Sequence, residues 1–570
     1  MRKLVLFLAA AAALSAQPAD SILYNGKIIT VWQAHPEVQA VAIRDGRFVA
    51  VGSNEEIMRT AGPETRRIDL RGRTVTPGLI DSHVHPIGAA LSEQQSEIPV
   101  LHSIDDLKQY IAKVARTAPS DKLIFVPKVY ATRMKEGRYP NRHDLDEAGG
   151  ADRLIVADNG YAAVLNSGAL SKAGITRDTP QPSNGKIIKD AAGEPTGLIL
   201  GASQLVSQFR SNRPITHQDQ LWAIKSMQQH YNRVGLTSVI DRGQSAAGMR
   251  AYQELWQKGE LTVRTYVTMM MNGHQPWDKL RLDILRLPNI TGFGDDWLRV
   301  GTIKVVLDGG ILIGTAYLRE PYGEHTEVYG YSDPDYRGVL NTPRENIMQM
   351  AKLTDQLNWQ MTAHTTGGGS SDILMDAYEA ANREKPIRDL RFTMTHVNFP
   401  NRSLIERAKR LGVLFDMQPA WMALDGAALK KVLGPERVKD FQPYRSIFDA
   451  GVIVAGGSDH MIKFDSRDAI NPYNPFYGMW MAITRKLTDG TVLEPEQRIS
   501  RQQALRMWTW NAAYLSFDEK RKGSIEPGKL ADLVVLDKDI LTCPEDDIRN
   551  IEAEATMVGG KFVYLSKSLE

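Results

Sequence analysis

Cysteine is almost absent from this chain of 570 residues, which contains only Cys543. A single thiol excludes an internal disulfide framework and any zinc site built on several cysteines. Metal chemistry must therefore use histidine, aspartate, glutamate or lysine. An excess of charge of one sign is also lacking, because 69 Lys and Arg face 67 Asp and Glu, a formal net charge of +2. Neither nucleic acid nor an anionic membrane is expected as a partner of so balanced a chain.

Long hydrophobic runs are lacking beyond the N-terminus. There, Arg2 and Lys3 precede an apolar stretch that ends in small residues around Ala16. This pattern is typical of a signal peptide. We expect residues 1–16 to be removed, which would leave a secreted or periplasmic protein with no membrane anchor. The alternatives are an uncleaved anchor helix or a disordered tail. The apolar stretch is short for a helix that spans a bilayer, which argues against the anchor.

Both ends of the mature chain are rich in short strand-like runs. With 42% hydrophobic and 24% charged residues, the composition is that of a folded protein, and the length predicts more than one domain. Turn dipeptides such as Asn25-Gly26 and Asp45-Gly46 separate the N-terminal runs. We expect residues 17–75 and 513–570 to form one small β-sandwich domain, since chain ends often lie close together.

The middle of the chain alternates apolar runs with amphipathic stretches, the pattern of parallel strands joined by helices. Eight runs that end in polar or glycine-rich turns are found at 79–83, 236–241, 263–269, 302–308, 360–364, 390–396, 413–417 and 452–459. Eight strands close a (β/α)8 TIM barrel, which we expect over residues 76–512. The strand-like runs 123–126 and 154–157 indicate an inserted α/β subdomain at about 92–225.

Histidines mark the ends of several predicted barrel strands. His83 and His85 are two residues apart on the first strand, so their side chains share a face and can reach one metal ion. His364, His396 and Asp459 end three further runs. Strand ends of a barrel converge on one mouth, and this donor set suits a divalent cation such as zinc. The alternative is that these five residues are structural.

Lys304 lies in the fourth predicted strand, where a charged side chain is costly unless it is paired or modified. A plain ion pair with a nearby carboxylate is one interpretation. Reaction with carbon dioxide is another, because the resulting carbamate has two oxygens that can bridge two metals. Asp308 is on the same strand face and is the rival bridging candidate.

Several segments together resemble a known family. Residues 75–86, Val-Thr-Pro-Gly-Leu-Ile-Asp-Ser-His-Val-His-Pro, resemble the entry motif of the amidohydrolase superfamily, and residues 523–537 resemble its closing motif. The segments 304–310 with 315–322, and 166–170 with 173–175, are similar to the amidohydrolase family 3 branch, which includes N-substituted formamide deformylase.

The resemblance implies an exported binuclear metal-dependent hydrolase that cleaves the amide-type C–N bond of a small molecule. It places His83, His85 and Asp459 on one divalent ion and His364 and His396 on the second, with zinc as the expected metal. Carbamylated Lys304 would bridge the two. Attack by a metal-bridging hydroxide, with Asp459 as general base and then acid, is the implied mechanism.

Two departures from the branch pattern concern substrate contacts. The branch follows its fifth-strand histidine with a sequence like Ala-Ile-Gly-Asp, whereas this chain has Thr-Thr-Gly-Gly-Gly at 365–369. It carries Gly-His in the inserted subdomain, whereas this chain has Gly160-Tyr161. The deformylase substrate is therefore not carried over. Tyr161 could donate a hydrogen bond to a substrate carbonyl or pack within the insert.

Three further residues are weaker candidates for substrate binding. Arg319 and Tyr322 follow the fourth strand and could hold a substrate carboxylate, although a surface salt bridge is the common fate of such an arginine. His460 adjoins Asp459 but faces the opposite side of an extended strand.

Other functions use the same features. A dipeptidase or an N-acyl-amino-acid hydrolase would employ the same centre, and a non-catalytic binding or regulatory protein could keep the fold. The five apparent ligands argue against the non-catalytic alternative. The sequence leaves the oligomeric state open and is compatible with a homo-oligomer.

Overall fold

A barrel of eight parallel strands forms the centre of the protein. The computed structural model describes residues 17–567 apart from 95–96, 183–184, 202, 211–212, 289, 324 and 332, so the expected leader lies outside the described residues. The barrel strands are, in spatial order, β8 (Leu79–Val84), β14 (Leu236–Gln244), β15 (Arg264–Met270), β16 (Leu298–Val306), β17 (Met361–Thr365), β18 (Thr393–His396), β19 (Leu414–Met417) and β20 (Val454–Gly456). The (β/α)8 prediction is confirmed, and each of the eight predicted runs overlaps a barrel strand.

The barrel closes where its first and last strands meet. A parallel bridge joins Val84 to His460. On either side of it, the Asp459 amide donates to the His83 carbonyl at 2.8 Å, and the His85 amide donates to the His460 carbonyl at 2.7 Å. This seam brings two histidines of the first strand beside the carboxylate that follows the last strand.

Helices follow the strands and cover the outside of the barrel. They are α2 (Pro86–Ser92), α7 (His217–Arg233), α8 (Ala246–Gln257), α9 (Trp277–Leu285), α10 (Arg344–Gln356), α11 (Gly368–Glu384), α12 (Arg402–Leu411), α13 (Ala420–Val438), α14 (Tyr444–Asp449), α15 (Pro475–Thr484), α16 (Arg501–Met507) and α17 (Trp510–Leu515). Capping residues set their starts: Thr216 and Asp219 form a capping box at α7, and the Asn401 side chain caps α12. None of the described helices is long and apolar enough to cross a membrane.

Two sheets at one end of the barrel form the composite β-sandwich. The first contains β5 (Arg47–Gly52), β4 (Ala40–Arg44), β1 (Ala19–Tyr24) and β6 (Ala61–Asp69); the second contains β23 (Lys561–Leu565), β22 (Ala553–Val558), β21 (Leu533–Leu536), β7 (Thr74–Pro77), β2 (Lys27–Ile29) and β3 (Glu37–Val38). Antiparallel pairing of β7 with β21 joins the chain ends, and Phe48, Val75 and Leu533 share one buried core. The fold prediction of a sandwich built from both ends is confirmed.

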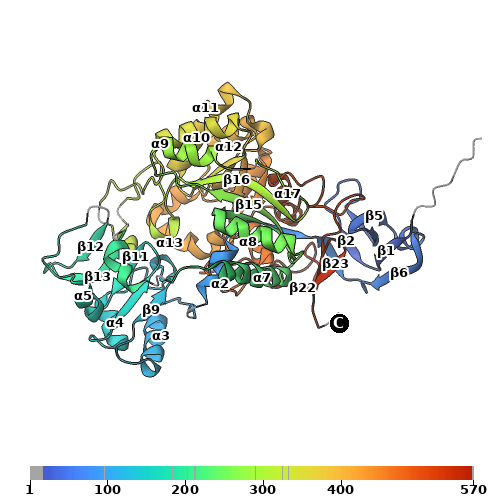
Figure 1. Ribbon diagram of the computed structural model, residues 1–570. Helices are drawn as coiled ribbons and strands as arrows, with labels where there is room; N and C mark the ends of the chain where they lie inside the picture. Colours follow the sequence, from blue (N-terminus) through green and yellow to red (C-terminus); the bar gives the residue numbers. More distant parts are fainter. Residues whose placement is uncertain are drawn as a thin grey trace, which may run out of the picture.

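The inserted α/β subdomain follows the first barrel strand, as predicted. Its five strands are β12 (Lys186–Lys189), β13 (Pro195–Leu200), β11 (Ala162–Leu165), β10 (Ile155–Asp158) and β9 (Ile124–Pro127), accompanied by α3 (Ile104–Thr117), α4 (Arg142–Gly149) and α5 (Ser167–Ala173). The insert and the β-sandwich lie on opposite sides of the barrel (Figure 1). The insert therefore lies beside a part of the barrel that is away from the sandwich (Figure 1).

Gly457 makes the close approach of the last strand to the first possible. A Cβ atom at this position would lie 2.8 Å from the His83 nitrogen and 2.8 Å from the Ser82 Oγ. We expect Gly457→Ala to lower the melting temperature, because forcing an extra group into a packed interior costs about 1–3 kcal/mol. Gly88→Ala is the matched control, since its Cβ would meet only a carbonyl oxygen at 3.8 Å. Equal thermal unfolding of the two variants would contradict this account of the seam.

Candidate metal centre

Three donor atoms from the barrel seam form a compact triangle. His83 and His85 approach each other through their Nε2 atoms at 3.3 Å. The Oδ1 atom of Asp459 lies 3.2 Å from each of these nitrogens. His83 and Asp459 are buried, and His85 is partly exposed, so the triangle is open to solvent on one side only.

The size of this triangle fits a metal ion. For metal–ligand distances of about 2.0–2.1 Å, the ligand atoms of a tetrahedral site lie about 3.3–3.4 Å apart. The three observed separations of 3.2–3.3 Å match that edge length. Two unprotonated ring nitrogens and a carboxylate oxygen this close together repel one another unless a proton or cation lies between them. The residues present therefore fit a divalent cation.

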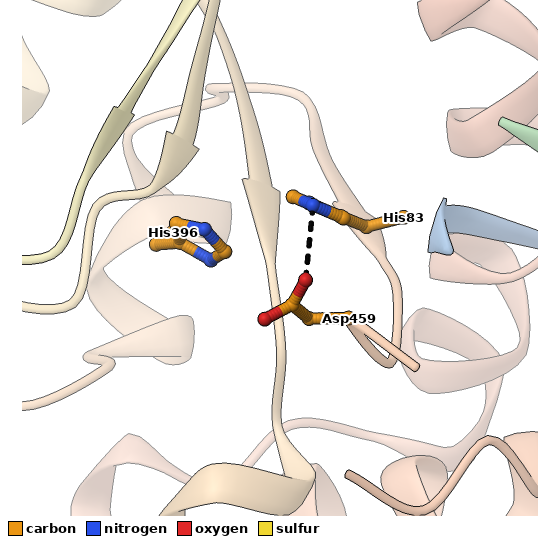
Figure 2. Close-up of side chains that lie close together, drawn as sticks. All are labelled: His83, His396 and Asp459. Carbon is orange, nitrogen blue, oxygen red and sulfur yellow. Dashed lines mark ion pairs between the residues drawn. The ribbon is translucent and has the colours of Figure 1, made fainter. Parts of the chain in front are cut away.

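Two more histidines extend the cluster. His396 is buried at the end of β18, and one of its ring nitrogens, an imidazole nitrogen of His83 and a carboxylate oxygen of Asp459 all lie within 4.8 Å of one another (Figure 2). The His396 ring stacks on those of His83 and Trp421, each at 4.9 Å between centroids. His364, at the end of β17, meets His396 edge-on at 4.5 Å. The structure thus brings together all five residues that the strand ends predicted.

The backbone is unusual at two of these positions. His396 has φ of +74° and Asp459 has φ of +56°, in the left-handed region that residues other than glycine rarely adopt. Each such residue costs about 1–3 kcal/mol and persists where the surroundings enforce it, often at functional sites. The strain is therefore consistent with side chains held in place for binding rather than for stability.

Each of three histidines has its Nδ1 atom bound to a fixed acceptor. The Nδ1 of His83 lies 3.2 Å from Asp416, that of His364 lies 2.9 Å from Asp308, and that of His396 lies 2.7 Å from the Gln418 Oε1. An acceptor at Nδ1 places the proton there and leaves the Nε2 lone pair free. This is the tautomer that a metal ligand requires.

Asp416 was missed by the sequence analysis, although it interrupts the apolar run 413–417. It is buried, and the Arg242 guanidinium lies 3.0 Å from its carboxylate. Burial opposes its ionisation, but the charge of Arg242 and the hydrogen bond from His83 hold its pKa below the usual value. Asp416 is therefore an ionised positioning residue for His83.

We expect Asp416→Asn to weaken metal binding and activity by about 10–100-fold, the usual effect of losing such a partner of a ligating histidine. The asparagine carbonyl still accepts from His83, but the negative charge that opposes Arg242 is lost. Metal titration monitored by activity measures the effect. Asp449→Asn, at an exposed ion pair with Arg445, is the control and should leave affinity unchanged. Wild-type affinity for the Asp416 variant would exclude this role.

Asp308 uses both of its carboxylate oxygens within the protein. Oδ1 accepts from the His364 ring and from the Thr366 amide at 3.0 Å, and Oδ2 accepts from the Gly367 amide at 2.8 Å and the Ser370 hydroxyl at 2.7 Å. These contacts shape the turn after β17 and orient His364. They argue against Asp308 as the bridging group.

Lys304 reaches the centre from β16. Its side chain is buried, and its Nζ atom lies 3.2 Å from the Nε2 of His83. Burial lowers the pKa of Lys304 to about 8, even though Asp459 favours the charged form. Among the described residues, no carboxylate lies within ion-pair distance of this lysine. The simple ion pair considered from the sequence is therefore not formed.

Two predicted substrate contacts are buried and have their polar atoms bonded within the protein. The Tyr322 hydroxyl donates to the Ala316 carbonyl at 3.0 Å. The His460 ring lies 3.1 Å from the Tyr231 hydroxyl and bonds the Lys463 carbonyl at 2.6 Å, and burial lowers its pKa to about 4. Both side chains are thus bonded within the protein, and their contact with a substrate stays a prediction.

The other two predicted substrate contacts are also occupied. Arg319 forms the ion pair considered as its alternative, with Asp372 at 2.7 Å, and also donates to the Phe399 carbonyl at 2.8 Å. Gly368, where the family 3 branch has an acid, makes room for this arginine, because a Cβ there would lie 2.5 Å from its guanidinium. The Tyr161 hydroxyl lies 2.5 Å from that of Tyr331, which belongs to the segment between β16 and α10. The substrate contacts proposed for Arg319 and Tyr161 therefore stay predictions.

Comparison with known proteins agrees with the fold and the cluster. The structure is similar to that of an uncharacterized metal-dependent hydrolase from Pyrococcus horikoshii, with a TM-score of 0.67 and 23% identity over 92% of this chain and 99% of that chain. It is also similar to zinc-bound atrazine chlorohydrolase TrzN from Arthrobacter aurescens, with a TM-score of 0.53 and 16% identity over 96% and 95% of the two chains. The shared fold is that of metal-dependent hydrolases.

Sequence comparison identifies the family. N-substituted formamide deformylase from Arthrobacter pascens is 28% identical over 96% of this chain and 99% of its own length, and the putative amidohydrolase YtcJ of Bacillus subtilis is 26% identical over 95% and 99%. The profile of the amidohydrolase family matches residues 66–564. The chain belongs to the amidohydrolase family, and it is a hydrolase.

Proposed function

We propose that this protein hydrolyses an amide-type C–N bond of a small molecule at a centre of two divalent metal ions. The observation that carries the proposal is the triangle of His83, His85 and Asp459 with tetrahedral edge lengths, placed beside a second histidine pair. The name of the deformylase relative, which specifies a substituted formamide, supports a C–N bond as the target.

The donor set divides into two groups. His83, His85 and Asp459 would hold one ion, and His364 and His396 would hold the other, with carbamylated Lys304 between them. Imidazole and carboxylate donors of this kind suit zinc. Bound divalent ions would supply Lewis acidity toward the substrate carbonyl and lower the pKa of water.

Asp459 is the proposed proton carrier. Burial alone would raise the pKa of its carboxyl, but its contacts with His83 and His85 hold that pKa well below its usual range. The carboxylate is therefore ionised at neutral pH and can accept the proton of the attacking water. Returning that proton to the leaving nitrogen completes the hydrolysis. Asn471 donates to the Asp459 carbonyl at 2.8 Å and fixes the residue in place.

Metal analysis and a hydrolysis screen together test the proposal. Purified protein loaded with zinc should retain about two equivalents and cleave at least one class among formamides, N-acyl amino acids and dipeptides. Activity should disappear with a chelator and return with metal. A protein that binds no metal and cleaves none of these compounds would instead be a binding or regulatory protein on the same fold.

We also propose that the protein is exported, on the evidence of Arg2, Lys3 and the apolar run that follows them. N-terminal sequencing of protein from the extracellular or periplasmic fraction should begin near Gln17. A mature protein that keeps Met1 and stays in the cytosol would contradict the proposal.

A further inference from the structure

A large cavity lies between the inserted subdomain and the barrel, and we call it the vestibule. Its volume is about 830 Å³, within the range of pockets that bind small molecules. Apolar side chains from both parts of the protein form much of its wall, including Tyr130 and Ile98 from the insert and Val432 and Tyr477 from α13 and α15. The vestibule can therefore enclose an apolar group of moderate size.

One loop connects the vestibule to the candidate metal centre. Residues 459–471 begin at Asp459 and return to it, because the Asn471 amide donates to the Asp459 carbonyl. Between these ends, Lys463 and Ile470 line the vestibule. The wall of the vestibule at Ile470 is thus one residue along the chain from the side chain that bonds Asp459.

The charges around the vestibule are mostly positive. Seven lysines and arginines line it against four aspartates and glutamates. Two of these cations, Arg133 and Arg467, are paired with acids outside the lining, Asp425 and Glu552, so among the described residues five unpaired cations remain against the four acids. The excess is local, because the whole chain is nearly neutral. Such a cavity attracts an anion rather than a cation.

Two of these lysines have no polar partner among the described residues. Within the described part of the chain, no hydrogen bond or ion pair engages the ammonium of Lys128 or Lys463. Lys128 is half-buried, and its neighbour Asp158 is already paired with Arg210 at 2.7 Å. Both lysines have left-handed backbones, with φ of +66° and +78°, a strain found at binding sites. A partly desolvated cation without a partner is costly, and an anionic ligand would remove that cost.

We propose that the vestibule binds the carboxylate of an anionic amide substrate through Lys128 and Lys463, and that its apolar wall receives a hydrophobic side chain. The substrate class is then an N-acyl amino acid with a bulky apolar side chain. This inference rests on the proposed amidohydrolase function and narrows it, because a neutral substituted formamide leaves both lysines unpaired.

Two matched substrates test the role of the carboxylate. N-acetyl-L-phenylalanine and N-acetylphenethylamine carry the same scissile amide and the same ring, and they differ only in the carboxylate. We expect wild-type kcat/KM to favour the acid, and Lys128→Met to lower it about ten- to a hundredfold for the acid through KM. For the neutral compound, kcat/KM should stay within twofold. Lys463→Met should act in the same direction.

Lys172→Met is the control for loss of one positive charge. Lys172 is exposed on α5 of the same insert and does not line the vestibule. This variant should leave both substrates unaffected. Thermal unfolding shows whether each variant is folded, and if Lys128→Met is unstable, Lys463→Met provides the comparison.

Calorimetric binding of 3-phenylpropionate separates the vestibule from the hydrolase proposal. Binding that weakens in Lys128→Met supports the vestibule even if no amide is cleaved, in which case only the hydrolase function fails. The inference is overturned if the wild type cleaves both amides equally and Lys128→Met changes neither turnover nor 3-phenylpropionate binding. That second result would leave the amidohydrolase function standing.

Discussion

Replacing Asp459 with asparagine should lower kcat by about 10²–10⁴-fold, the usual contribution of a general acid–base group. The asparagine keeps an oxygen that can bind a metal ion, in the place where the Asp459 Oδ1 lies 3.2 Å from the nitrogens of His83 and His85. The neutral amide, however, cannot accept a proton from water. The loss should appear in kcat more than in KM, because Asp459 is proposed to act on the reacting water and the leaving group. Steady-state kinetics on metal-loaded protein provides the measurement.

Metal content must be measured on the same Asp459→Asn sample, because the residue has two proposed roles. If both ions are retained and the rate falls, the proton-transfer role accounts for the loss. If metal is lost, ligation dominates, and activity at saturating metal gives the remaining effect. Asp449→Asn, far from the seam on the exposed side of α14, should be indistinguishable from wild type. An Asp459→Asn enzyme within tenfold of wild type would exclude proton transfer by this residue.

That the five strand-end residues come together could be predicted from the sequence, because the barrel itself determines where they meet. Alternation along β8 places His83 and His85 on one face, and closure of the barrel brings Asp459 beside them. These relations depend only on the period of a strand and on the parallel arrangement. For this reason residues more than 370 positions apart, such as His83 and Asp459, could be assigned to one cluster before the fold was known.

The partners of polar atoms could not be predicted in the same way. Tyr322 and Arg319 follow a barrel strand, as a substrate-binding residue does, but the first is bonded to a nearby carbonyl and the second is paired with an acid on α11. His460 finds its partner in Tyr231, whose position in the sequence gives no hint of this contact. A sequence shows that a polar group is present, but only the packed structure shows whether that group is already satisfied.

The positioning residues and the vestibule depend on the fold for a similar reason. Asp416 had one sequence signal, an acid inside an apolar run, but its role follows from its contacts with Arg242 and His83. Asn471 had no such signal, because its contact with Asp459 depends on the path of the loop between them. The vestibule exists only because the insert folds against the barrel, which no local pattern encodes.

Replacing Lys304 with alanine should remove at least one metal ion and most of the activity. The proposal is that a carbamate on this lysine bridges the two ions. Two observations support it. The Lys304 Nζ is buried 3.2 Å from the Nε2 of His83. The other candidate for the bridge, Asp308, already uses its carboxylate oxygens in hydrogen bonds with His364 and Gly367. An ammonium at this place would repel both cations, whereas a carbamate attracts them.

The pKa of Lys304 gives this prediction a pH dependence. Carbon dioxide reacts with the neutral amine, and burial lowers the lysine pKa to about 8, so the reactive fraction grows as the pH rises toward 8. At a fixed concentration of dissolved carbon dioxide, reconstitution of metal-free protein should therefore be faster at pH 8 than at pH 6.5. Without carbon dioxide, reconstitution should be incomplete at either pH.

Chemical rescue distinguishes a bridging anion from a lysine that merely fills space. In Lys304→Ala the removed side chain leaves room beside His83, and a short carboxylate such as propionate can enter with the charge of the missing carbamate. Propionate should restore part of the metal content and of the activity, whereas propionamide, which has nearly the same shape but no charge, should restore neither. Wild-type protein reconstituted with ¹³C-bicarbonate should also show a carbamate carbon by NMR. Full metal content and activity with an unmodified Lys304 would contradict the bridge and leave the five strand-end ligands as the whole of the proposed metal centre.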